Sequence, residues 1–249
     1  MQHRIASPAD WLTARRALLE KEEAFARLQA ELVAERRALP WVAVEQAYVF
    51  DAPGGPVSLG DLFDGRSQLF VKHFMLAPGQ AAPCFGCSFE VEHVGPMVEL
   101  LASHDVSYVA VARAPIDEIE TVRRRMGWRF PWVSSHHNTF SYDYGVSFTS
   151  EQRAAGTASY NYRAGDPGID DLPGNSVFYR DEIGRIFHTY SSYGGGGEWF
   201  LGVNRLLDAT PKGGDGCDAR QGSAALLRRR WEESAETRRY GLARAATTR

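Results

Sequence analysis

The sequence predicts an α/β fold in which a central mixed sheet is flanked by helices. A mostly apolar strand over residues 67–75 leads into a helix that runs to about residue 103, and a second apolar strand over 106–112 leads into a helix that opens at Pro115. This order of strand, helix, strand, helix is a βαβα unit, which implies a parallel sheet with right-handed crossovers. Two further strand-like runs within residues 176–190 flank a turn, which indicates an antiparallel hairpin.

The composition is that of an ordinary globular protein. The chain has 249 residues, of which 44% are hydrophobic and 24% charged, and its formal net charge is -3. This balance gives no general attraction to nucleic acid or acidic lipid. No stretch approaches the roughly 18 apolar residues of a membrane span, and charges interrupt the N-terminus too often for a signal peptide. With only three cysteines, a disulfide scaffold is also disfavoured, so we expect a cytoplasmic protein without nucleic-acid or membrane partners.

The first predicted element is a helix whose start and end are both marked by residue type. Ser7 and Pro8 supply an N-cap and a first-turn proline, and the helix should end near Leu39-Pro40. Large apolar residues repeat every seven positions along it: Trp11, Leu18, Phe25 and Leu32. Such a stripe needs a partner surface, so we expect the helix to pack on the domain or on a second copy of the chain, as a homodimer.

The chain divides into three parts. Residues 1–40 form the helical extension, and residues 41–210 form one α/β domain that starts with strand-like runs around a Pro/Gly turn at 52–56. Within this domain, the polar segment near 150–174 is best explained as a surface insertion. Residues 211–249, rich in Gly, Ala and Arg, form a C-terminal tail.

Cys84 and Cys87 form the most informative motif, a CxxC at the start of a helix. At that position, free backbone N–H groups and the helix dipole favour a negative charge, so the first thiol should be a thiolate near neutral pH. The second thiol lies one turn later and can displace a mixed disulfide. The motif therefore predicts a redox pair, with Cys84 as nucleophile and Cys87 as resolving thiol.

Other uses of these thiols are less well supported. A zinc site would need a second Cys/His pair at matching spacing, whereas Cys217 stands alone and His136-His137 are adjacent. The peroxidase pattern Pro-x-x-x-Thr-x-x-Cys fails, because Ala77 and Ala81 stand where Cys84 would require proline and threonine. Two incidental buried thiols remain an alternative. No metal and no organic cofactor is expected.

Three residues near the predicted sheet edge are candidate auxiliaries. Lys72 and His73 lie on the strand that leads to the motif, where either could stabilise a thiolate or move a proton. Arg113 ends the next strand, at the edge where α/β proteins bind ligands. A structural histidine and a surface salt bridge are the competing interpretations for His73 and Arg113.

Long motifs along the chain resemble the DUF899 family. The matching runs are Val71-Lys72-His73-Phe74-Met75, Cys84-x-Gly86-Cys87-Ser88-Phe89, Val111-Ala112-Arg113-Ala114-Pro115, Phe130-Pro131-Trp132-Val133 and Tyr142-Asp143-Tyr144-Gly145-Val146. The resemblance implies a thioredoxin-like fold and a dithiol–disulfide oxidoreductase with Cys84 and Cys87 in the active-site position. Phe85 departs from the family pattern, which has proline after the first cysteine.

The sequence therefore predicts a thiol–disulfide oxidoreductase that acts on a disulfide-containing protein or small molecule. One alternative is a thioredoxin-fold binding or scaffold protein whose cysteines carry out no redox reaction. Another is a protein that binds a metal through the same thiols.

Overall fold

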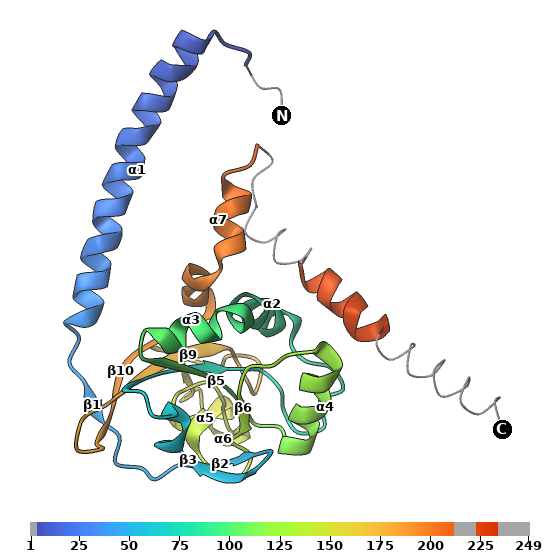
Figure 1. Ribbon diagram of the computed structural model, residues 1–249. Helices are drawn as coiled ribbons and strands as arrows, with labels where there is room; N and C mark the ends of the chain where they lie inside the picture. The colour runs from blue at the N-terminus through green and yellow to red at the C-terminus, as the bar shows by residue number, and fades with distance from the viewer. Residues whose placement is uncertain (1–3, 212–222, 234–249) are drawn as a thin grey trace, which may run out of the picture. The chain divides into compact units, whose positions relative to one another are not determined.

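The computed structural model describes residues 4–211 and 223–233, and the chain divides into two units, Met1–Trp41 and Val42–Arg249 (Figure 1). The first unit consists of α1 (Pro8–Arg37). Ser7 caps α1 as predicted, because its Oγ accepts a hydrogen bond of 3.2 Å from the Asp10 N–H. The helix ends three residues before Pro40.

The second unit is built on an eight-stranded mixed sheet. Its strand order is β1-β10-β9-β4-β5-β6-β2-β3. The strands are β1 (Val42–Ala43), β2 (Val49–Ala52), β3 (Gly55–Ser58), β4 (Gln68–His73), β5 (Val106–Ala112), β6 (Trp132–Ser134), β9 (Gly174–Arg180) and β10 (Ile186–Tyr193). β4, β5 and β6 run parallel, and the predicted hairpin β9–β10 pairs antiparallel to β4. The sheet with its flanking helices is a thioredoxin-like α/β fold.

The helices that the sequence predicted after β4 and β5 are present, with one difference. The expected helix to residue 103 is divided into α2 (Phe85–Val94), the 3-10 turn η2 (Gly95–Met97) and α3 (Val98–Ser103). Pro96 explains the break, because proline has no N–H to continue the α-helical ladder. After β5, α4 (Ile116–Met126) ends at Gly127, whose φ of 74° is left-handed.

Shorter elements complete the second unit. They are the 3-10 turns η1 (Asp61–Phe63) and η3 (Gly194–Phe200), the helices α5 (Phe140–Asp143), α6 (Ser150–Ala154) and α7 (Gly202–Asp208), and the small strand pair β7 (Ser159–Tyr160) and β8 (Arg163–Ala164). Residues 223–233 form a further helix, which packs on the core through Leu227, 3% exposed. None of the helices in the described ranges is long and apolar enough to cross a membrane.

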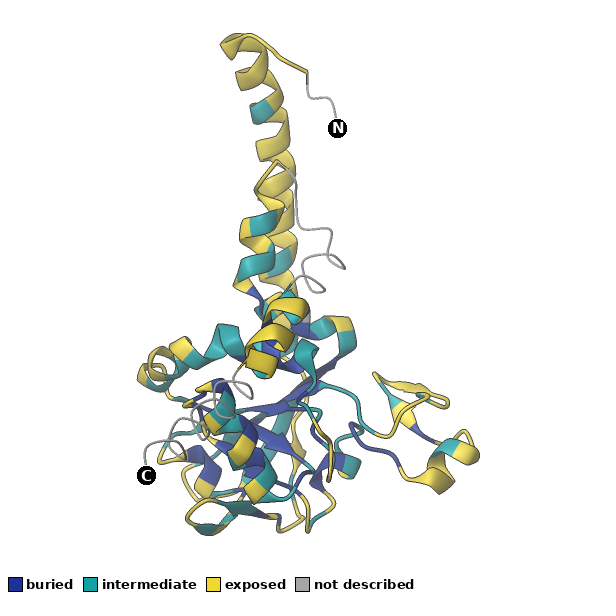
Figure 2. Cartoon of the chain, turned by 90° about the vertical axis from the view of Figure 1, so that its right-hand side faces the viewer, coloured by how far each residue is buried: buried dark blue, intermediate teal, exposed yellow. Residues whose placement is uncertain are grey.

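Both faces of the central strands are buried, whereas α1 is exposed along most of its length (Figure 2). Alternate residues of β5 belong to different cores: Tyr108 and Ala110 pack with α2 and α4, and Val109 packs with α5 and η1. This alternation follows from the period of two along a strand. It determines which side chains of β4 can approach the CxxC motif.

Candidate active site

Cys84 occupies the N-cap position of α2, with an extended backbone at φ −62° and ψ 117°. Its Sγ accepts a hydrogen bond of 3.5 Å from the backbone N–H of Cys87. Its carbonyl oxygen accepts from the Ser88 N–H at 2.9 Å, which starts the helical ladder. The sulfur therefore takes the place of the oxygen of a serine or aspartate cap, where the helix end stabilises negative charge.

Cys87 has a very different environment. It is 1% exposed and belongs to the apolar core, whereas Cys84 is partly exposed. The Sγ of Cys87 accepts a hydrogen bond of 3.5 Å from the backbone N–H of Met75, which follows β4. The two thiols thus come together at the start of α2, with the first nearer to solvent.

These environments separate the two pKa values. The pKa of Cys84 is lowered to about 6, chiefly by a hydrogen bond with the Cys87 thiol, against the opposing effect of burial. The backbone N–H groups of Cys87 and Gly86 and the charge of Lys72 lower it further. The pKa of Cys87 is raised by the same hydrogen bond and by burial. At pH 7, Cys84 would therefore be mainly thiolate while Cys87 keeps its proton.

Lys72 lies on the same face of the sheet as the thiols. It is 1% exposed, and its Nζ forms an ion pair with the Glu90 carboxylate, one turn after Cys87 on α2. Burial by itself would lower the pKa of Lys72, but Glu90 first and Cys87 second raise it overall. Lys72 is therefore a fixed positive charge beneath the motif.

His73 points to the opposite face, as expected for consecutive residues of a strand. Its Nε2 lies 2.8 Å from the Ser176 Oγ, and its ring lies 5.5 Å from that of Phe140 in the other core. Burial first, and then the charge of Lys72, lowers the pKa of His73 to about 3, so the ring is neutral. The structure therefore does not bring His73 to the thiols.

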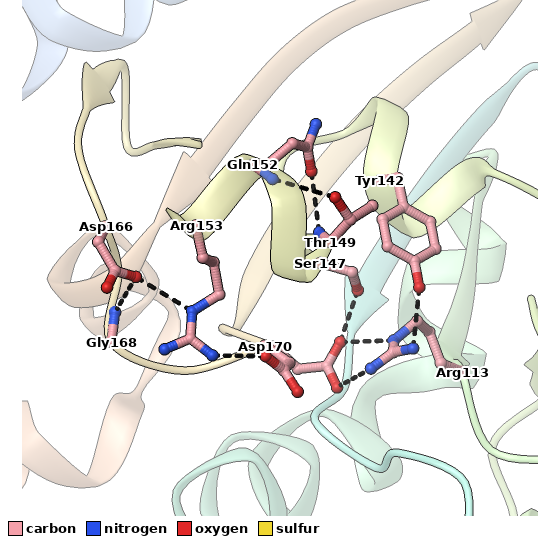
Figure 3. Close-up of polar contacts among 10 residues, drawn as sticks. Arg113, Tyr142, Ser147, Thr149, Gln152, Arg153, Asp166, Gly168 and Asp170 are labelled. Carbon is pink, nitrogen blue, oxygen red and sulfur yellow. Dashed lines mark hydrogen bonds and ion pairs between the residues drawn. The ribbon is translucent and has the colours of Figure 1, made fainter. Parts of the chain in front are cut away.

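Arg113 is engaged in an ion pair. Its Nε and Nη2 donate to the Asp171 carboxylate at 2.7 and 2.6 Å, and its Nη1 donates to the Tyr142 hydroxyl at 3.0 Å (Figure 3). Ser147 also donates to Asp171, at 2.6 Å. Asp171 comes from the segment near 150–174, so Arg113 ties that segment to the end of β5.

Phe85, which lies between the two cysteines, is contacted by the helix at residues 223–233. The guanidinium carbon of Arg228 lies 5.2 Å from the centre of the Phe85 ring, a cation–π distance. The aromatic side chain between the two cysteines thus provides a packing surface for the C-terminal segment.

Sequence reasoning missed Glu90, although it lies three residues after Cys87 and hence on the same side of α2. No group of three or more His, Cys, Asp or Glu side chains that could hold a metal lies within residues 4–211 and 223–233. Cys217 lies outside the described residues.

Comparisons with known proteins extend these observations. The fold resembles a peroxidoxin from Mycobacterium tuberculosis, with 14% identity, 68% of this chain and 97% of that chain covered, and a TM-score of 0.44. It also resembles peroxiredoxin Q from Xanthomonas campestris, with 12% identity, 66% and 97% covered, and a TM-score of 0.43. No curated protein matches the sequence. The model of DUF899, described as a bacterial protein of unknown function, matches residues 1–232, and the chain therefore belongs to the DUF899 family.

Proposed function

We propose that this protein is a thiol–disulfide oxidoreductase that uses Cys84 and Cys87. One observation carries the proposal: a partly exposed Cys84 caps α2 with its pKa lowered to about 6, beside a buried thiol one turn later. Disulfide exchange needs two groups of this kind: a nucleophilic thiolate, and a second thiol that stays protonated until the mixed disulfide has formed.

In the first step, the Cys84 thiolate attacks one sulfur of a substrate disulfide. The substrate S–S bond breaks, a mixed disulfide forms, and the leaving thiolate takes a proton from solvent. Because Cys84 is then no longer a hydrogen-bonding anion, the main cause that raises the pKa of Cys87 is removed. The charge of Lys72 favours the Cys87 thiolate as it forms.

In the second step, the Cys87 thiolate attacks the Cys84 sulfur and displaces the second substrate thiolate. The protein is left with a Cys84–Cys87 disulfide, and the substrate has gained two electrons. An external dithiol reductant must return the pair to the reduced state. We expect the substrate to be a disulfide-containing protein or small molecule, in the cytoplasm, where thiols are kept reduced.

The proposal is tested by mass spectrometry of reduced protein incubated with oxidised glutathione. All variants carry Cys217→Ser, so that only the two candidate thiols can react. We expect the Cys84/Cys87 protein to form an internal disulfide. It should release two molecules of reduced glutathione for each molecule of oxidised glutathione consumed. The Cys87→Ser variant should retain one glutathione on Cys84, and the Cys84→Ser variant should retain none.

A Cys84 that stays unmodified would contradict the redox function and favour a binding or scaffold protein. A protein that holds stoichiometric zinc after purification, released when the thiols are alkylated, would instead favour the metal-binding alternative. With Cys87→Ser as a trap, a substrate protein would be recovered as a mixed disulfide with Cys84.

A further inference from the structure

A cavity of about 170 Å³ lies between the sheet and the α2–α3 segment. Six side chains give it a mainly apolar wall: Phe70, Val94, Met97, Leu101, Phe200 and Leu201. Met97, which also lines the cavity, is 39% exposed. A buried apolar cavity of about 150 Å³ is enough to hold benzene, so this one has room for a single substituted ring.

Four polar residues also line the cavity: Lys72, Glu90, Tyr108 and Asn175. Strand register places Lys72 on β4 beside Asn175 on β9, and Tyr108 on β5 beside Phe70, on the other side of β4. The Lys72 and Glu90 charges compensate each other in their ion pair. This end of the cavity is therefore polar and carries no net charge.

Tyr108 and Asn175 are the unusual members of this group. They are 3% and 4% exposed as whole residues, and within the described residues neither the Tyr108 hydroxyl nor the Asn175 side-chain amide forms a hydrogen bond. Neither group is among the fully enclosed polar atoms that lack a partner, so both reach the open space of the cavity that they line. Buried polar groups in folded proteins nearly always have a partner, because leaving one unpaired is costly. A hydroxyl without a partner in the wall of an apolar cavity is a group with which the polar atom of a ligand could form a hydrogen bond.

We propose that this cavity binds a small neutral molecule with an apolar ring and one hydrogen-bonding oxygen, of the phenol or aromatic ketone class. The ring lies among the apolar side chains, and the oxygen forms a hydrogen bond with the Tyr108 hydroxyl. A carboxylate ligand is disfavoured because Glu90 already neutralises Lys72. The site does not depend on the thiol chemistry proposed above.

The test is NMR of the full chain with ¹³C-labelled methionine methyl groups, titrated with phenol, toluene and benzoate. We expect phenol to shift the Met97 methyl resonance saturably, and toluene to bind about threefold to tenfold more weakly, the cost of one lost hydrogen bond. Benzoate should bind more weakly than phenol. The Met126 methyl, which does not line the cavity, serves as the internal reference.

Two kinds of variant separate this site from adventitious binding. Tyr108→Phe removes one hydroxyl and should bring the phenol affinity closer to that of toluene, with the toluene affinity unchanged. Leu101→Trp fills the cavity and should abolish binding of both, whereas the matched control Leu100→Trp, at a neighbouring position that is 65% exposed, should leave it intact.

The proposal is overturned if phenol does not shift Met97, or if Leu101→Trp binds phenol as well as Leu100→Trp does. It is also overturned if phenol and toluene bind equally and Tyr108→Phe changes neither. If Leu101→Trp does not fold, the Tyr108→Phe comparison still decides the question.

Discussion

Lys72, buried on β4, forms an ion pair with Glu90, which lies one helical turn after Cys87 on α2. The pair joins the central strand to the helix that carries both thiols. Because Lys72 is 1% exposed, its charge is poorly solvated, and the ion pair with Glu90 compensates it.

Removing one charge of this pair should lower the free energy of unfolding more than removing both charges does. We expect Lys72→Met to lower the free energy of unfolding by about 3–5 kcal/mol, because it leaves the Glu90 charge uncompensated. The double variant Lys72→Met/Glu90→Gln should recover part of that loss. Urea denaturation measures the free energy of unfolding of both variants. If Lys72→Met were as stable as the unmodified protein, the ion pair would contribute nothing to stability.

His73 should make stability depend on pH. Its pKa is lowered to about 3 in the folded protein, from 6.5 when exposed, so the unfolded chain binds a proton first as the pH falls. The stabilisation from the neutral ring is complete above pH 6.5 and is lost as the pH falls towards about 3.

The variant His73→Gln lacks this titration but keeps a group able to hydrogen-bond Ser176. The difference in unfolding free energy between the unmodified protein and His73→Gln should therefore shrink as the pH falls from 6.5 towards 3. Denaturant titrations at several pH values measure it. A constant difference across that range would mean that His73 titrates normally.

The Arg113–Asp171 ion pair should hold the segment near 150–174 on the sheet. Both side chains are largely buried, at 20% and 14% exposed, so Arg113→Ala should cost about 1.5–3 kcal/mol and speed amide hydrogen exchange in that segment. Arg153 is the matched control, because its partners Asp166 and Asp170 are 50% and 64% exposed. Arg153→Ala should cost under about 1 kcal/mol, and equal effects of the two would contradict this role.

Several large apolar side chains of α1 are exposed, among them Trp11 and Leu18. We propose that a second copy of the chain packs on the part of the apolar stripe formed by Trp11 and Leu18, which are 61% and 51% exposed.

Light scattering after size-exclusion chromatography measures this association. We expect a dimer, which Trp11→Glu/Leu18→Glu converts to a monomer and which Ala30→Glu, on a different face of α1, leaves unchanged. A monomeric unmodified protein would rule out the homodimer.

Local sequence signals were enough to predict the framework of the site. The cap at Ser7, the βαβα order and the turn between β9 and β10 are confirmed because each depends on neighbouring residues. The position of Cys84 at the start of α2 follows from the same kind of signal. The break at Pro96 was also present in the sequence, as a proline inside an apolar helical pattern.

The surroundings of the thiols depend on contacts between distant residues. Strand alternation places Lys72 and His73 on opposite faces, but only the packed fold shows which face α2 covers. The partners of Lys72 and Arg113 are similarly remote, at Glu90 and Asp171, and charge alone could not select them from the many acidic residues of the chain.

The ionisation of Cys84 tests the central claim most directly. In a Cys217→Ser background, the rate of Cys84 alkylation by a soluble probe is measured against pH, with Cys87→Ala as the comparison. We expect a midpoint near pH 6, and a higher midpoint in Cys87→Ala because the thiol hydrogen bond is gone. A midpoint at or above about 8.5, the value of a free cysteine, would contradict the account.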